Sequence, residues 1–496
     1  MNPDPEPEPI ATTVATLSAP DSTPDPATAD PTTRDPATAS LTTPDPATAG
    51  RATPDPANQD DERPGREPPV TARTLLRDRV FRRYWSAQTV SFFGDQVSLL
   101  AVPLLAVLVL HASPAQMGYL TAAGLAPNLV LPLVAGVWVD RRRRRRYVMI
   151  ASDLARAVLV ASIPVAYALG ALGLGQLYLV AFLIGCFSTL FELGNSTLYV
   201  SVAPRAGLVQ AGSLINGSRA MSFVGGPAIG GWLVQILTAP VALLADALSF
   251  LGSAWFLARI RPTEPAPETR RGGQVTAGLR FLTGSRLLWS AIVAVATVNL
   301  FNFMYSALVI LYVTAYLGIS PGLLGVLIGA ASVGALLGSV VTGRLVRAIG
   351  VGPAYLVGLI AFPVPLLLVP AAGGPRPVVI VLLLAAEFAS GLGVMILDIA
   401  YGSISAALVP ARLRARVAGT TRTLNYGIRP IGALLGGALG SAIGVRPTLW
   451  IATAGAGFGA LWLIGSPILR LRALPAEADD EADDGADAVL PPAETG

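Results

Sequence analysis

Residues 136–146 read GVWVDRRRRRR: a glycine, three apolar residues, an aspartate and six consecutive arginines. This run closes an apolar stretch at 116–138. About 20 apolar residues are enough for a helix to cross a bilayer, and arginines gather at the cytoplasmic ends of such helices. The run therefore predicts a membrane helix with its arginine-rich end on the cytoplasmic side.

Apolar stretches of similar length recur on both sides of this run. We predict twelve membrane-spanning helices, at 85–110, 116–138, 147–169, 176–199, 212–236, 240–258, 288–312, 321–342, 353–371, 377–400, 418–443 and 448–468. Short connectors make two pairs the hardest to separate, namely the second with the third and the fifth with the sixth.

The distribution of arginine supports this number of helices. With both termini in the cytoplasm, 25 of the 35 basic residues lie in cytoplasmic segments, and two, Arg376 and Arg446, lie in outer loops. Adding or removing one helix would reverse every later loop and destroy this bias. The sequence thus predicts a multi-pass protein of the plasma membrane with both termini cytoplasmic.

Composition argues against most enzyme classes. The chain is 53% hydrophobic and 13% charged, whereas soluble domains carry about 25% charged residues. All basic residues are arginine, so a P-loop lysine and Schiff-base chemistry are excluded. With one histidine, His111, in a short connector, and one cysteine, Cys186, no His/Cys metal cage is possible. We expect no enzymatic activity, no cofactor, no metal and no nucleic-acid partner.

Two tails flank the apolar body. Residues 1–74 repeat a Thr-Pro-Asp-Pro-Ala pattern, and residues 473–496 are strongly acidic, so both lack the apolar surface needed for a core. We expect the first to be a disordered cytoplasmic tail, with a partner-docking arm as the alternative, and the second to be a disordered acidic tail. Between them we predict a six-helix half at 75–258, a central cytoplasmic loop at 259–287 and a second six-helix half at 288–472.

The two halves repeat one another. A shift of 206 residues places three glycines of the first half on three of the second, Gly226 on Gly432, Gly230 on Gly436 and Gly231 on Gly437. Parallel six-helix halves imply a pseudo-two-fold axis along the membrane normal, with a substrate path between the halves.

The opening run resembles the signature loop of the major facilitator superfamily, Gly-x-x-x-Asp-Arg-x-Gly-Arg-Arg. The matching residues are Gly136, Asp140, Arg141, Arg144 and Arg145, while Arg143 replaces the usual glycine. The resemblance implies an all-α membrane fold of twelve helices in two pseudo-symmetric halves. It also implies a gating loop, in which Asp140 faces the N-terminus of helix eleven and latches the outward-facing state. A plain topogenic arginine cluster is the alternative.

The fifth predicted helix carries a second motif. Gly226, Pro227, Gly230 and Gly231 match the Gly-Pro-x-x-Gly-Gly signature that this superfamily shows mainly in proton-coupled exporters. Proline bends a helix, and glycines let a neighbour pack against the bend. The motif favours export over uptake, although ordinary small-residue packing would also account for it.

The first predicted helix resembles one branch of the superfamily. Its sequence FRRYWSAQTVSFFGDQ (81–96) and the Asp153-x-x-Arg156 pair are similar to exporters of the enterobactin and macrolide type. This resemblance covers about residues 75–470 and implies efflux of a small amphipathic molecule, such as a drug, a siderophore or another natural product.

Four carboxylates inside predicted helices are candidates for proton coupling. They are Asp95, Glu192, Glu387 and Asp398. A carboxylate at mid-bilayer costs a few kcal/mol on the most lenient insertion scale, and burial disfavours its charged form, so it can bind and release a proton during transport. Asp95 is our first candidate, with a permanent ion pair to an arginine as its alternative.

Other polar residues allow further assignments. We expect Asp153 and Arg156, three residues apart, to neutralise each other, and Asp246, the intramembrane carboxylate nearest the outer surface, to be solvated. Seven residues are candidates for substrate contacts or charge pairs: Arg219, Asn299, Asn302, Tyr305, Arg422, Asn425 and Arg429. A carboxylate partner would satisfy the arginines as well as an anionic substrate, and helix–helix hydrogen bonds would explain the others.

These observations predict a secondary transporter that exports a small molecule in exchange for protons and works as a monomer in the lipid bilayer. Two alternatives remain open at this stage. One is a proton-coupled uptake permease of the same fold, and the other is a non-transporting membrane sensor that contacts partners through its tails.

Overall fold

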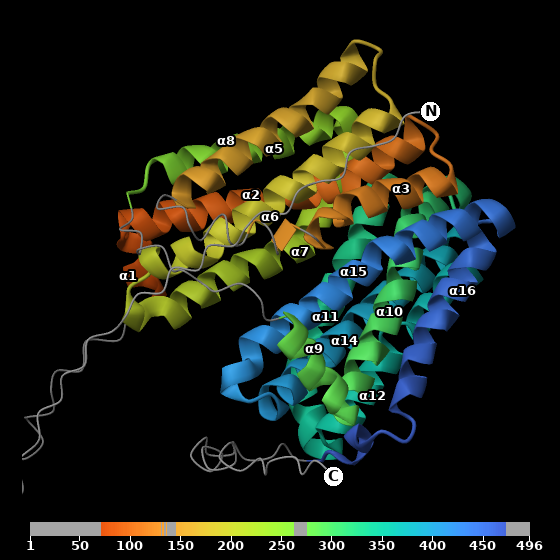
Figure 1. The fold of residues 1–496 in the computed structure, drawn as a ribbon. Coiled ribbons are helices and arrows are strands. Elements are labelled where there is room, and N and C mark those ends of the chain that lie inside the picture. Colours follow the sequence, from red (N-terminus) through yellow and green to blue (C-terminus); the bar gives the residue numbers. More distant parts are fainter. Residues whose placement is uncertain (1–70, 130, 133–134, 136–144, 262–274, 473–496) are drawn as a thin grey trace, which may run out of the picture. The chain divides into compact units, whose positions relative to one another are not determined.

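The computed structural model describes residues 71–129, 131–132, 135, 145–261 and 275–472, and these residues form helices joined by short connectors (Figure 1). The α-helices are α1 (Ala72–Arg77), α2 (Arg79–Leu108), α3 (Pro114–Leu125), α5 (Arg145–Ala168), α6 (Leu174–Val202), α7 (Leu208–Leu237), α8 (Ala239–Ala258), α9 (Val275–Gly284), α10 (Arg286–Leu311), α11 (Pro321–Ile349), α12 (Val351–Ala361), α13 (Leu368–Ala371), α14 (Arg376–Leu408), α15 (Ala411–Ile443) and α16 (Val445–Gly457). Shorter turns are η2 (Arg205–Gly207), η3 (Tyr312–Tyr316), η4 (Val364–Leu367), η5 (Phe458–Leu463) and η6 (Pro467–Arg470).

Nine of the described helices are long and apolar enough to cross a membrane. Three predicted spans fall short of that standard for separate reasons. Of the second span the structure describes mainly α3, because most of 130–144 lies outside the described residues. The arginines of α15 lower its mean hydropathy, and α16 is only 13 residues long before it tightens into η5.

Sequence chemistry accounts for several helix ends. Asp78 precedes α2, and its carboxylate accepts hydrogen bonds from the backbone N–H groups of Val80 and Phe81, both at 3.1 Å. Thr238 alone separates α7 from α8, with φ at +77° breaking the helix. The predicted boundary between these two spans is therefore confirmed. The helix α12 ends just before Pro363 and Pro365, because proline lacks the backbone N–H group that a continuing helix would need.

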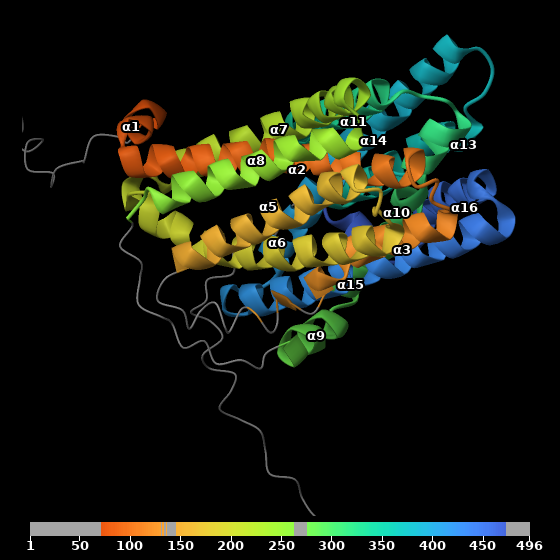
Figure 2. The ribbon, with the colours of Figure 1, turned by 90° about the horizontal axis from the view of Figure 1, so that it is seen from above.

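The helices form two halves that match the two sequence repeats. In the N-terminal half α2 packs on α7 and α8, and α5 packs on α6 and α8. In the C-terminal half α10 packs on α15 and α16, and α14 packs on α11 and α12. Figures 1 and 2 show these long helices running side by side within each half. The predicted all-α major facilitator architecture is confirmed.

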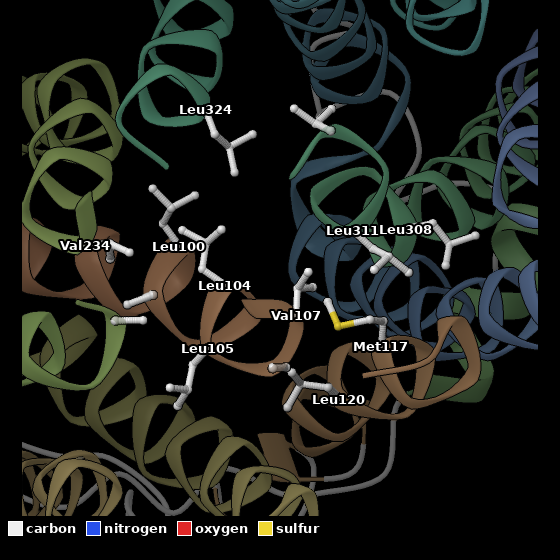
Figure 3. Close-up of a cluster of buried hydrophobic side chains, with 14 of the residues drawn as sticks. Leu100, Leu104, Leu105, Val107, Met117, Leu120, Val234, Leu308, Leu311 and Leu324 are labelled. Atoms are coloured by element: carbon white, nitrogen blue, oxygen red, sulfur yellow. The ribbon is translucent and has the colours of Figure 1, made fainter. Parts of the chain in front are cut away.

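The halves share a hydrophobic core at one end only. We call this the closed end, where connectors 109–113 and 317–320 lie. Figure 3 shows side chains of this cluster from both halves, among them Leu104 of α2, Met117 of α3 and Leu308 of α10. At the opposite or open end, where connectors 203–207 and 409–410 lie, the clusters of described buried residues are separate. One surrounds Phe81 and belongs to the N-terminal half. The others belong to the C-terminal half.

Glycines bring the two halves into backbone contact at the closed end. A Cβ atom added to Gly231 of α7 would lie 3.1 Å from Cα of Gly325 on α11. A Cβ atom added to Gly437 of α15 would lie 2.9 Å from Cα of Gly118 on α3. Hydrogen bonds add to both interfaces, including one of 3.0 Å from the amide of Ala115 to Oγ of Ser441. The helices therefore approach closely enough to exclude solvent.

The same glycine motifs contact equivalent helices inside each half. Gly230 packs on Val97 of α2, and Gly436 packs on Met304 of α10. These two contacts follow the predicted internal repeat, since Val97 and Met304 lie 207 residues apart. One further pair of matching segments was missed at the sequence level: SPAQMG (113–118) in the first half and SPGLLG (320–325) in the second supply the partners of the two glycine motifs.

We predict that Gly231→Val lowers the thermal midpoint of the purified protein in detergent, whereas Gly225→Val on the same helix has little effect. The new side chain at 231 meets the backbones of Pro321 and Gly325, which cannot rotate away, whereas position 225 has open space. Overpacking of this kind costs about 1–3 kcal/mol. Equal midpoints for the two variants would show that the α7–α11 contact does not need the glycine.

Candidate functional site

A cluster of charges surrounds Arg156 on α5. Its guanidinium donates a hydrogen bond to Oδ1 of Asp153, one turn earlier, so the expected neutralisation of this pair is confirmed. Nη1 of Arg156 also lies 3.8 Å from Oδ1 of Asp95 on α2. The rings of Phe191 and Phe250 cover the guanidinium at 4.7 and 4.3 Å. These contacts hold a cation in an environment that is apolar on two sides.

Asp246 of α8 is buried beside this cluster. It is 1% exposed, so the prediction that it is solvated is wrong. It accepts hydrogen bonds from the hydroxyl of Ser98 on α2 and from that of Ser249 at 3.0 Å. The reason is the close packing of α2 on α8, because a Cβ atom at Gly94 would overlap with both Ser249 and Asp246. Glycine at this position lets the two helices enclose the carboxylate.

The three carboxylates differ in their access to water. The side chain of Asp153 is fully buried and Asp246 is nearly so, but 43% of the Asp95 side chain is exposed. One guanidinium cannot neutralise three ionised carboxylates, and an unpaired charge in a low-dielectric interior is costly. Asp95 therefore has the most accessible side chain of the three carboxylates in this cluster.

A second ion pair joins the two halves. Nη2 of Arg422 on α15 lies 3.4 Å from Oε2 of Glu192 on α6, and both side chains are more than half exposed. From the sequence, the partner of Arg422 could be either a carboxylate or an anionic substrate. In the structure the carboxylate of Glu192 takes this place. Arg219 on α7, which belongs to the corresponding Arg/Asn set of the N-terminal half, instead places its guanidinium 4.9 Å from the ring centre of Phe92.

Glu387 and Tyr305 form an interhelical contact in the C-terminal half. The hydroxyl of Tyr305 on α10 donates to Oε1 of Glu387 on α14 at 3.1 Å. Tyr305 is 6% exposed and belongs to the core of the closed end. It thus lies beyond Asn299 and Asn302, toward that core, and is not among the residues that line the cavity described next.

A cavity of about 660 Å³ opens among α10, α14 and α15 of the C-terminal half. Six predicted residues line it: Asn299, Asn302, Asp398, Arg422, Asn425 and Arg429. Its lining continues to Val409 and Arg414 at the open end. The rings of Phe303 and Tyr426, which sequence reasoning did not single out, lie 4.9 and 4.1 Å from the guanidinium carbon of Arg429. The sequence signal for them was that Phe303 directly follows Asn302 and Tyr426 directly follows Asn425.

The predicted gating loop is described only at its end. Gly136, Asp140, Arg141 and Arg144 lie outside the described residues. Arg145 is buried at the start of α5. Its neighbour Arg146 donates a hydrogen bond to the backbone oxygen of Ile260, just beyond the end of α8. This contact fixes the end of the loop to the open end of the N-terminal half.

Comparison with known proteins supports a transport role for this arrangement. The sequence profile of the transmembrane secretion effectors, a major facilitator (MFS) family, matches residues 70–488. YfiS of Bacillus subtilis, described as an uncharacterised MFS-type transporter, is 29% identical over 374 residues, which cover 73% of this chain and 86% of YfiS. The multidrug efflux pump Tap of Mycolicibacterium fortuitum is 29% identical over 368 residues, covering 72% of this chain and 88% of Tap.

Solved structures show the same fold at low sequence identity. A bacterial homologue of the iron transporter ferroportin, in an inward-facing state, superposes with a TM-score of 0.66 at 16% identity, covering 79% of this chain and 98% of that protein. The nucleoside transporter NupG gives a TM-score of 0.61 at 14% identity, with 78% and 98% covered.

We predict that Arg156→Gln strongly destabilises the protein, because it leaves Asp153 buried without its cation. Breaking one partner of a buried ion pair costs about 3–5 kcal/mol, whereas removing both partners costs much less. The double variant Asp153→Asn/Arg156→Gln should therefore recover much of the lost thermal stability in detergent. A double variant no more stable than Arg156→Gln alone would contradict this account of the cluster.

Proposed function

Because the chain belongs to the transmembrane secretion effector family of major facilitator transporters, we propose that it exports a small amphipathic molecule across the plasma membrane in exchange for protons. The observation that carries the proton coupling is the position of Asp95. It lies on a helix long and apolar enough to span a membrane, with 43% of its side chain exposed, at the edge of a buried cluster with more carboxylates than cations.

Two observations favour export over uptake. Relatives that cover most of this chain include efflux pumps. The glycine motif of α7, typical of exporters, forms one of the two contacts that hold the closed end together. With the termini in the cytoplasm, as the arginine distribution predicts, the closed end is outside and the cavity opens inward. This is the state in which an exporter collects its substrate.

A physical connection runs from Asp95 to the contact between the halves. Residues Gln96 and Val97, which follow Asp95 on α2, pack directly on Gly226 and Gly230 of α7. The adjacent face of α7 carries Gly231, which packs on α11 of the other half. A change in the charge of Asp95 alters its electrostatic attraction to Arg156 on α5. Because Asp95 lies on α2, this changes the force on α2 and hence its packing against α7. We infer that protonation of Asp95 shifts the balance between closure at the two ends.

The proposed cycle follows alternating access. Substrate enters the cavity from the cytoplasm, and the halves rock about the site until the open end closes and the closed end parts. A proton taken up by Asp95 from outside removes a charge that would otherwise stay half-desolvated, and its release to the cytoplasm restores the attraction to Arg156. The downhill proton movement thereby drives uphill export.

We predict that Asp95→Asn abolishes proton-coupled export while the protein still inserts and folds. The measurement is proton release from energised inside-out vesicles that contain an internal pH dye, on addition of a panel of small amphipathic compounds. Asp78→Asn is the matched control, since it removes a carboxylate at the start of the same helix and asparagine caps helices equally well. The control should keep wild-type proton release.

Two outcomes would count against the proposal. Full proton release by Asp95→Asn would remove this carboxylate from the coupling mechanism. Substrate movement out of the inside-out vesicles, down their proton gradient, would identify a proton-coupled uptake permease instead.

A further inference from the structure

One face of α8 carries a continuous stripe of exposed apolar side chains. The residues of this stripe are Val241, Leu244, Leu248, Leu251 and Trp255. Their spacing of three and four residues places them in line along one side of the helix. Other sides of α8 pack on α2 and α5. Because α8 is long and apolar enough to span a membrane, the stripe faces the acyl chains of the bilayer.

The stripe ends in an aromatic ring followed by a cation. Trp255 lies in the last turn of α8, and Arg259 directly follows the helix. The guanidinium carbon of Arg259 lies 4.6 Å from the centre of the Trp255 ring. Tryptophan is enriched at the level of the lipid headgroups, and its ring attracts cations. The side chain of Arg259 is therefore held at the headgroup level, next to the stripe.

Arginines of two neighbouring helices reach the same end of α8. Nη1 of Arg83 on α2 donates a hydrogen bond of 2.7 Å to the backbone oxygen of Arg259. Arg146 on α5 donates to the backbone oxygen of Ile260. A guanidinium carries five N–H donors, so one backbone oxygen leaves Arg83 able to bind an anion as well.

The described part of the chain supplies no carboxylate to Arg83 or Arg259. No ion pair joins either of them to an acidic residue there. Asp78, five residues before Arg83, uses its two oxygens for the backbone N–H groups at the start of α2. Two positive charges thus lie side by side with the apolar stripe and its terminal tryptophan.

We propose that Arg83, Arg259 and Trp255 form a binding site for an anionic phospholipid of the cytoplasmic leaflet. The phosphate binds the two guanidiniums, the glycerol region contacts Trp255, and an acyl chain lies along Leu248 and Leu251. The order of residues along α8, from apolar through aromatic to cationic, is the order of the parts of a phospholipid. The arginine distribution, which predicts that the open end is cytoplasmic, assigns the leaflet.

A lipid fits this surface better than a second copy of the chain. Two copies with the same orientation in a membrane would bring their arginines to the same depth, where like charges repel each other. A phospholipid with net negative charge supplies both an apolar chain for the stripe and an anion for the arginines. Phosphatidylcholine supplies the chain, but its headgroup has no net charge.

The test compares two lipids that share their acyl chains, palmitoyl-oleoyl phosphatidylglycerol and palmitoyl-oleoyl phosphatidylcholine. Native mass spectrometry of the purified protein in detergent gives an affinity for each lipid during a titration. Each basic residue near an anionic lipid surface strengthens attraction about fivefold, so we expect phosphatidylglycerol to bind about 25-fold more tightly. Equal affinities would overturn the proposal. A stable dimer that Trp255→Ala dissociates would assign the stripe to a second copy and overturn it as well.

Variants assign the preference to the end of α8. Arg83→Gln/Arg259→Gln should lose most of the preference for phosphatidylglycerol and keep its affinity for phosphatidylcholine. Arg344→Gln/Arg347→Gln is the matched control, because it removes the same charge from exposed positions near the open end of α11. The control should keep the preference. An equal loss in both double variants would show that overall charge, with no site at α8, attracts the lipid.

A single variant separates lipid binding from the support of the helix end. Arg259→Gln leaves the hydrogen bond of Arg83 in place, because that bond uses the backbone oxygen of residue 259. It should weaken phosphatidylglycerol binding about fivefold at an unchanged thermal midpoint. Full affinity in this variant would contradict the site.

The soluble headgroup distinguishes a lipid from a free phosphate ester. Glycerophosphoglycerol, which lacks acyl chains, should not displace bound phosphatidylglycerol when both are present at the same concentration. Displacement would identify a phosphate site that does not use the stripe, and it would overturn the assignment to a lipid.

Discussion

In the N-terminal half, Asp95, Asp153 and Asp246 gather around the guanidinium of Arg156, with Arg219 as a more distant positive charge near Asp95, and the rest of the proposed mechanism depends on that shortage of positive charge. Asp153 takes the direct hydrogen bond of Arg156, and two serine hydroxyls solvate Asp246. Asp95 is left with a looser approach of 3.8 Å to Arg156 and with the most exposed side chain of the three. A buried cluster with excess negative charge is unfavourable in a medium of low dielectric constant. Binding a proton at its water-exposed edge relieves that cost.

The fold links the charge of Asp95 to the contact between the two halves. The halves share a core only at the closed end, where glycines bring α7 against α11 and α15 against α3. The residues that follow Asp95 pack on Gly226 and Gly230 of the same glycine motif, on an adjacent face of α7. Charge is also divided between the halves, because carboxylates predominate around Arg156 and arginines predominate in the C-terminal cavity. In the proposed cycle protons and substrate therefore use different halves of one rocking structure.

Sequence alone predicted the architecture because its determinants are local. Apolar length sets each span, arginine placement sets the connectors, and the repeated glycines such as Gly231 and Gly437 identify equivalent helices. The candidate site was less accessible, since it depends on packing between distant segments. Asp246 was expected to be solvated because its partners, Ser98 and Gly94, lie about 150 residues earlier in the chain. Likewise, no local pattern links Tyr305 to Glu387 or Arg422 to Glu192.

The central claim is that the protonation state of Asp95 sets the conformation of the two halves. The most direct test measures the distance between spin labels at Arg205→Cys and Arg347→Cys, near the open ends of α7 and α11, with Cys186 replaced by serine. Double electron–electron resonance in lipid nanodiscs would compare acidic with mildly alkaline buffer. Our account predicts that the distance distribution changes with pH and that Asp95→Asn holds the acidic distribution at both values. A pH-dependent change that persists in Asp95→Asn would contradict it.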